Sequence, residues 1–179
     1  MRVRDHILIS TAGAVLAAPF IGPGALSLWA GGVLIDADHY VWYCLKQRRL
    51  SPMAAAQFFN EADPPQHAAT RALHAPAVLA PALLLGLRRR SLLPVVLGMG
   101  LHVALDAHHL ARMGRARSAA LARDRYSCRS CGTATPPVRA HVWRQPALLP
   151  SYQAENLISL CGPCHDAAHA RPRGPALWT

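Results

Sequence analysis

The stretch Glu155-Asn-Leu-Ile-Ser-Leu-Cys-Gly-Pro-Cys-His165 joins a short apolar run to a Cys-x-x-Cys pair and a histidine. A second pair, Cys128-Arg-Ser-Cys131, lies upstream of it. Two such pairs a few tens of residues apart are typical of a tetrahedral metal site rather than of disulfides. We therefore predict that one structural Zn²⁺ is bound, with Zn–S distances near ~2.3 Å, by Cys128, Cys131, Cys161 and Cys164.

Histidines surround this cysteine framework. His141 lies on a short alternating segment that reads as a β-strand, and Asn156 directly precedes the apolar run. His165 and His169 are four residues apart, which places both imidazoles on one face of a predicted helix. Paired imidazoles of this kind predict a second divalent ion. The alternative is a plain zinc ribbon that binds DNA or protein without chemistry.

These residues together resemble the HNH endonuclease family, over residues 124–169. Members carry a histidine-led β-hairpin, an asparagine in the loop and a helix that starts Cys-His, often clamped by two Cys-x-x-Cys pairs. The resemblance implies a small ββα-metal domain bound to zinc that hydrolyses DNA with a catalytic Mg²⁺, Mn²⁺ or Zn²⁺ and no organic cofactor. The roles that it implies are general base for His141, ordering of the loop or metal binding for Asn156, and catalytic metal ligands for His165 and His169.

The charge of the chain is divided unevenly. The 179 residues carry 19 basic and 9 acidic side chains. Ten of the basic but only three of the acidic groups lie in residues 112–179. A short, strongly cationic segment indicates a polyanionic partner such as DNA, or an anionic membrane surface.

The first 111 residues are apolar. Their pattern predicts four helices, near 7–22, 25–45, 73–87 and 91–111. A membrane span needs about 20 apolar residues, a length that the first two reach and the last two do not. We expect membrane association through residues 7–111 in a bacterial inner membrane, with the cysteines in the reducing cytoplasm. A soluble helical domain, in a wholly cytoplasmic protein, is the alternative.

The changes in composition divide the chain into four parts. These are an apolar helical domain (1–111), a basic connector (112–125), the zinc domain (126–170) and a flexible tail (171–179).

Polar side chains inside the apolar helices form a third motif. Such groups are costly in an apolar setting and usually have a function. Imidazoles and carboxylates that converge between helices suit zinc, manganese or iron, although a buried hydrogen-bond network is the alternative for any one of them. The candidate ligands of this second site are His6, Asp36, Asp38, His39, His74, His102 and Asp106.

Most of residues 1–110 resemble a family of bacterial inner-membrane metal-dependent hydrolases. The matching elements are His6, the Asp36–His39 motif, His74-Ala75, and the helix from Gly98 through His102 to Asp106. The chain departs from the family at Ile35, where a proline is usual, and lacks a His-Arg-Gly element. The resemblance implies hydrolytic chemistry at a metal site.

Three functions follow from these observations. The first is a membrane-associated HNH-type DNA endonuclease. The second is a membrane metal-dependent hydrolase whose zinc module only binds nucleic acid. The third is a DNA-binding protein with a decayed active site, because Ala140 stands where HNH family members usually carry a metal ligand.

Overall fold

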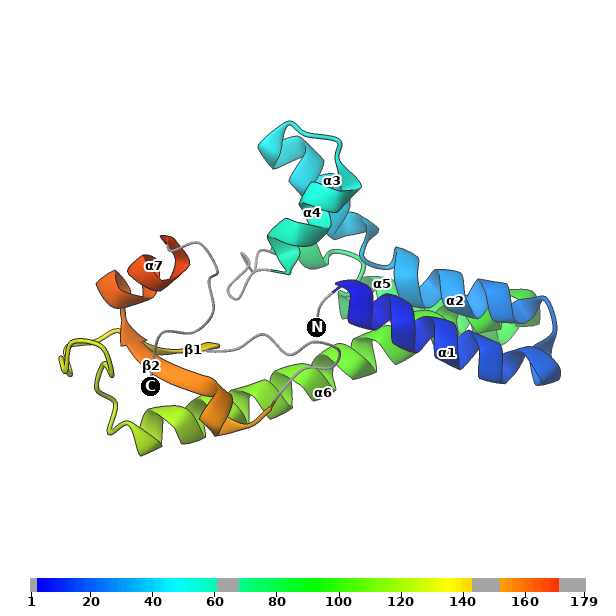
Figure 1. Cartoon of the computed structure of the whole chain (residues 1–179). Coiled ribbons are helices and arrows are strands. Elements are labelled where there is room, and N and C mark those ends of the chain that lie inside the picture. The colour runs from blue at the N-terminus through cyan, green and yellow to red at the C-terminus, as the bar shows by residue number, and fades with distance from the viewer. Residues whose placement is uncertain (1–2, 61–67, 143–151, 171–179) are drawn as a thin grey trace. The chain divides into compact units, whose positions relative to one another are not determined.

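The computed structural model describes residues 3–60, 68–142 and 152–170. The chain is mainly helical, with a small two-stranded sheet and a cysteine cluster near its C-terminal end (Figure 1). It divides into two compact units, Met1–His109 and Leu110–Thr179. The helical N-terminal part and the small cysteine-bearing sheet agree with the fold class predicted from the sequence.

The N-terminal unit consists of helices joined by short turns. They are α1 (Val3–Ile21), α2 (Gly24–Leu34), α3 (Ala37–Gln47), α4 (Pro52–Phe59), the 3₁₀ turn η1 (Ala68–Arg71), α5 (Pro76–Arg88), the 3₁₀ turn η2 (Arg90–Leu92) and the first part of α6 (Leu93–Arg123).

The apolar run 25–45, predicted as a single helix, forms two helices. Helix α2 ends at Leu34 and α3 begins at Ala37, with Asp36 between them at φ −77° and ψ 6°. Short polar side chains such as aspartate favour helix ends because they compete for backbone hydrogen bonds. The break places the Asp36–His39 motif at a turn rather than inside a continuous helix.

Helices α2 and α6 approach each other at backbone contact. A Cβ atom added to Gly31 would clash with the carbonyl group of Val95, and one added to Gly98 would clash with the carbonyl group of Leu28. Only a residue without a side chain fits such a contact. This packing brings the polar face of α6 against the end of α2.

The C-terminal unit is a two-stranded antiparallel sheet that packs against helices. It contains the end of α6, β1 (Val138–Val142), the 3₁₀ turn η3 (Ala154–Asn156), β2 (Leu157–Cys161) and α7 (Gly162–Ala170). The register pairs His141 with Ile158 and Val142 with Leu157.

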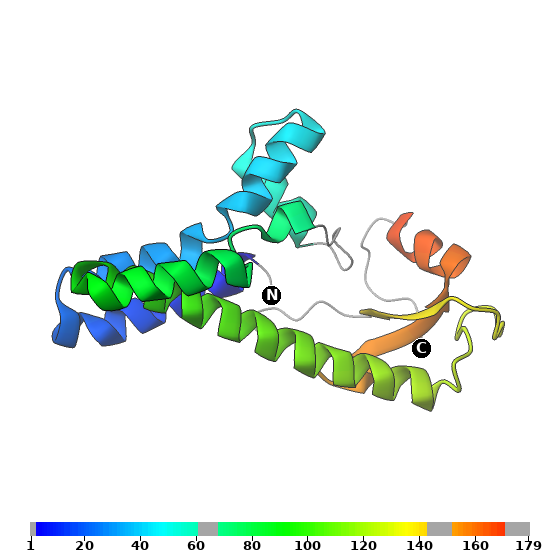
Figure 2. The same ribbon diagram turned by 180° about the vertical axis from the view of Figure 1, so that it is seen from behind.

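The sheet lies between α6 and α7 (Figures 1 and 2). Ala116 and Ala120 of α6 form an apolar cluster with Leu157, and Ala140 and Val142 of β1 pack against it. Because side chains alternate along a strand, Arg139 and His141 face the other side of the sheet. That side is the one covered by α7, which contacts both strands.

Among the described residues, one helical stretch is long and apolar enough to cross a membrane. It runs from Arg90 to Arg123, and 11% of its most apolar window is buried within the protein. Helix α5 is apolar but shorter. The apolar stretches predicted near 7–22 and 25–45 do not pass this test. The second of them is divided into two short helices at Asp36.

Candidate functional site

The four cysteines of the C-terminal unit converge, as the sequence predicts. Their Sγ atoms all lie within 4.8 Å of one another, and those of Cys131 and Cys161 are 3.6 Å apart. A tetrahedral site with Zn–S distances of ~2.3 Å requires sulfur–sulfur separations of about 3.8 Å. The group therefore fits a zinc ion with little movement.

The first cysteine pair lies in a tight turn that prepares it for a metal. Cys128 N donates to the carbonyl of Thr133 (2.8 Å), and Gly132 closes the turn at φ 78°. Burial tends to raise the pKa of the Cys128 thiol, but the backbone N–H groups of Cys161, Cys131 and Ser130 outweigh it and lower that pKa to about 6. The lowered pKa favours the thiolate of Cys128, the form that binds metal, whereas the pKa values of Cys131 and Cys161 are raised by neighbouring cysteines in the cluster.

The predicted catalytic histidines of this unit lie next to each other. His141 projects from β1, and His165 follows Cys164 on α7. Their ring centroids are 4.9 Å apart, and the rings are nearly perpendicular at 88°. Asn156 ends η3 directly before β2, half-buried. The side chain of His169 lies outside the described residues.

Ala140 occupies a structural position rather than an empty ligand position. It is part of the apolar contact between β1 and α6, on the face of the sheet opposite His141. A metal ligand at this residue would point away from the two histidines.

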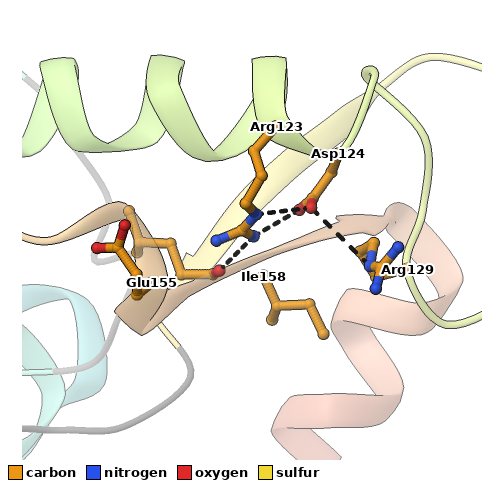
Figure 3. Close-up of a pocket in the computed structure, with 6 residues that line it drawn as sticks. Arg123, Asp124, Arg129, Glu155 and Ile158 are labelled. Carbon is orange, nitrogen blue, oxygen red and sulfur yellow. Dashed lines mark hydrogen bonds and ion pairs between the residues drawn. The ribbon is translucent and has the colours of Figure 1, made fainter.

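Arg123 and Asp124 form an ion pair at the end of α6, next to β2. Together with Arg129 and Glu155 they line a pocket (Figure 3). Arg123 donates to both Asp124 carboxylate oxygens and to the Leu157 carbonyl, each at 2.8 Å. The hydrogen bond from Arg123 lowers the pKa of Asp124. Because the charges of Arg123 and Asp124 neutralise each other, we interpret the pocket as a structural element.

The seven candidate ligands of the N-terminal unit also come together. They are supplied by α1, the α2–α3 turn, α3, the turn after η1, and α6. Their ligand atoms form three overlapping groups, within each of which all atoms lie within 4.8 Å of one another. The groups are Asp36, Asp38, His39 and His74; His6, Asp36 and His102; and His74, His102 and Asp106.

His102 is the most buried member of this cluster, with no exposed surface. Its Nδ1 lies 2.8 Å from the carbonyl oxygen of Gly32. A carbonyl only accepts, so Nδ1 carries a proton and donates this bond. That Nε2 lies 3.3 Å from Asp36 Oδ1 and 3.7 Å from Asp106 Oδ2.

The other imidazoles face the same carboxylates. His74 Nε2 is 3.4 Å from Asp36 Oδ1, and His39 Nδ1 is 2.7 Å from Asp38 Oδ1. His6 Nε2 is 3.1 Å from Asp106 Oδ1, and its ring stacks on His102 at 3.9 Å. Mixed imidazole and carboxylate ligands suit zinc, manganese and iron.

One residue near this cluster was not identified from the sequence. Arg71 Nη2 lies 3.8 Å from Asp106 Oδ2, and the Arg71 side chain is 37% exposed. It is brought there by η1, a single turn within a segment that the sequence marks only as polar. No periodic pattern could have placed it.

No protein-family model, curated protein or solved structure matches this chain.

Proposed function

We propose that this protein is a metal-dependent, HNH-type endonuclease that hydrolyses DNA phosphodiester bonds at its C-terminal unit. The observation that carries the proposal is the contact between His141 on the strand and His165 on the helix that follows the second cysteine pair. The sequence separates these two residues widely, and the folded unit brings them together beside a potential zinc clamp.

The donor set suits such a reaction. The His165 side chain is 13% exposed, so its imidazole is accessible from solvent while packed against His141. Imidazole nitrogens are good ligands for the divalent ions that assist phosphodiester hydrolysis. Such an ion, when bound, would stabilise the charge that develops on the phosphate.

His141 acts as the general base in this proposal. Its imidazole takes a proton from water, the water oxygen forms a bond to phosphorus, and the bond from phosphorus to the leaving oxygen breaks. The leaving oxygen takes a proton from solvent water and departs as a hydroxyl group. His165 would hold the divalent ion, with His169 as the second proposed ligand. Ala140 contributes no ligand because it packs into the apolar cluster.

The charge and the apolar surface support the proposed partners. Residues 112–179 hold ten basic and three acidic groups, which favours binding to DNA phosphates. In the N-terminal unit, Leu16, Phe20 and Leu26 are 74%, 87% and 70% exposed, as expected of helices that contact lipid. We place the protein at the bacterial inner membrane, with the cysteine-bearing unit in the reducing cytoplasm.

Nicking of supercoiled plasmid by the full-length protein with Mg²⁺ or Mn²⁺ tests the proposal. His141→Ala should lower the rate by about 10²–10⁴-fold and leave DNA binding nearly unchanged, because phosphate affinity comes from arginines. His108→Ala, which removes an exposed histidine in the other unit, is the control. The proposal fails if the wild-type protein nicks no faster than His141→Ala.

A second candidate function is hydrolysis at the N-terminal cluster, with the C-terminal unit serving only to bind nucleic acid. The convergence of seven metal-ligating side chains favours it. Hydrolytic activity that is lost in Asp36→Asn and retained in His141→Ala would support this candidate over the nuclease.

A further inference from the structure

We propose that the N-terminal unit binds a pair of divalent metal ions that share Asp36, and that this pair binds a phosphate group. The pair deepens the second candidate function and is independent of the nuclease. Two observations carry it, the division of the seven ligands into groups and the position of buried ring nitrogens opposite carboxylate oxygens.

Two of the three ligand groups define separate positions, and the third (His74, His102 and Asp106) shares one histidine with each of them. Asp36, Asp38, His39 and His74 surround the first, and His6, Asp36 and His102 surround the second. A single zinc or manganese ion binds about four to six ligands, which is fewer than the seven side chains present. Asp36 belongs to both groups, and a carboxylate with two oxygens can bridge two ions.

Buried ring nitrogens of the cluster lie opposite carboxylate oxygens. His102 Nε2, His74 Nδ1 and His74 Nε2 are buried and make no hydrogen bond within the described part of the chain. Each nevertheless lies 3.3–3.7 Å from a carboxylate oxygen. A divalent cation between such a ring nitrogen and a carboxylate would bind both, since these are ligand types that zinc and manganese accept.

The surroundings fix these ligands in place. The hydrogen bond from His102 Nδ1 to Gly32 O orients the imidazole ring, as backbone carbonyls do for many metal-binding histidines. Leu73 N donates to Asp38 Oδ2 at 2.9 Å, which orients that carboxylate. The contact between α2 and α6 holds Gly32 against His102. The ligand atoms are therefore already arranged before a metal binds.

A charge balance identifies the ligand of the pair. Two divalent ions exceed the charge of the three carboxylates by one, and Arg71 beside Asp106 adds another positive charge. An anion is therefore favoured in the centre. Arginine suits phosphate because its planar guanidinium donates to two oxygens at once. Asp36 and His39 are 22% and 25% exposed, so the pair is open to solvent on their side.

Manganese binding by the full-length protein tests the pair. All measurements use a His165→Ala background, which removes the proposed nuclease metal, with the cysteine site loaded with Zn²⁺. Manganese prefers oxygen and nitrogen ligands over thiolates. We expect two Mn²⁺ per chain with an exchange-coupled electron paramagnetic resonance spectrum. One bound Mn²⁺, or two without coupling, would overturn the pair.

Three variants locate the ions. His39→Ala and His6→Ala should each leave a single, uncoupled Mn²⁺, whereas His108→Ala should keep both. His39 is partly exposed, so its replacement is compatible with folding even if that of the buried His6 is not. Retention of a coupled pair in His39→Ala, in protein with native circular dichroism, would contradict the assignment.

Inorganic phosphate is the probe for the anion. It should bind to the manganese-loaded protein, change the coupled spectrum, and bind about tenfold more weakly to Arg71→Gln at an unchanged metal count. A spectrum insensitive to phosphate would refute the anion assignment and leave the metal count as a separate result. Because none of these readouts is nuclease activity, their failure is distinguishable from failure of the nuclease proposal.

Discussion

Replacing Gly98 by alanine is expected to destabilise the N-terminal unit, although alanine is the better helix former. Alanine gains about 1 kcal/mol over glycine inside a helix. At Gly98, however, the new Cβ meets the Leu28 carbonyl and lies 2.8 Å from Gly32 N. Backbone atoms cannot rotate aside, so the overpacking penalty lies near the upper end of the usual range, about 3 kcal/mol. The net loss is about 2 kcal/mol.

Gly100, two residues further along α6, is the matched control. A Cβ at Gly100 meets nothing within 4 Å, so Gly100→Ala should stabilise the protein by about 1 kcal/mol. The two variants should then differ by about 3 kcal/mol, which corresponds to about 6–12 °C in Tm for a chain of this size. Thermal unfolding followed by circular dichroism measures this difference. Equal Tm values for the two variants would refute the close approach of α2 and α6.

Three further substitutions test the C-terminal unit. Cys161→Ser should lose the zinc together with the fold of this unit, as followed by metal analysis and limited proteolysis; stoichiometric zinc in the variant would contradict the four-cysteine site. Ala140→Asp should destabilise the protein by about 2–3 kcal/mol in chemical denaturation, because it buries a carboxylate in the apolar cluster; unchanged stability would place residue 140 outside that cluster. Asp124→Asn should cost about 1–3 kcal/mol at pH 7. Since the folded-state pKa of Asp124 is lowered, this difference should begin to shrink as the pH falls below about 4 and be lost below the folded-state pKa. A difference that does not change with pH would argue against the Arg123–Asp124 ion pair.

The sequence predicted best where chemistry restricts the choice of residues. Four cysteines in two Cys-x-x-Cys pairs are typical of a single metal site, so their convergence could be expected. Similarly, histidines and aspartates within apolar helices need polar partners when they are buried, and the spacing of His102 and Asp106 places both on one helical face. His6 and His74, from distant segments, lie beside them because they too are buried polar groups that need such partners.

The elements that were not predicted depend on tertiary contacts or on a short signal. The break at Asp36 falls in an apolar run that reads as one helix, and it is stabilised by contacts such as that between Asp38 and Leu73 N. Helix α4 was absent from the prediction, although Ser51-Pro52 is a helix-start signal and the Ser51 hydroxyl accepts from Ala54 N at 3.2 Å. The close approach of Gly31 and Gly98 has no signature in a single sequence.

Successive side chains of β1 face α6 and α7 in turn, and this has a consequence for how each position tolerates substitution. A saturation mutagenesis library of this strand should give two interleaved patterns. Ala140 and Val142, which face α6, should accept only small or apolar replacements, and losses there should lower protein abundance. His141 faces α7, so its replacements should leave abundance largely intact and change only the proposed nuclease activity. A five-residue strand would thus separate mutations that affect folding from those that affect the proposed chemistry, position by position.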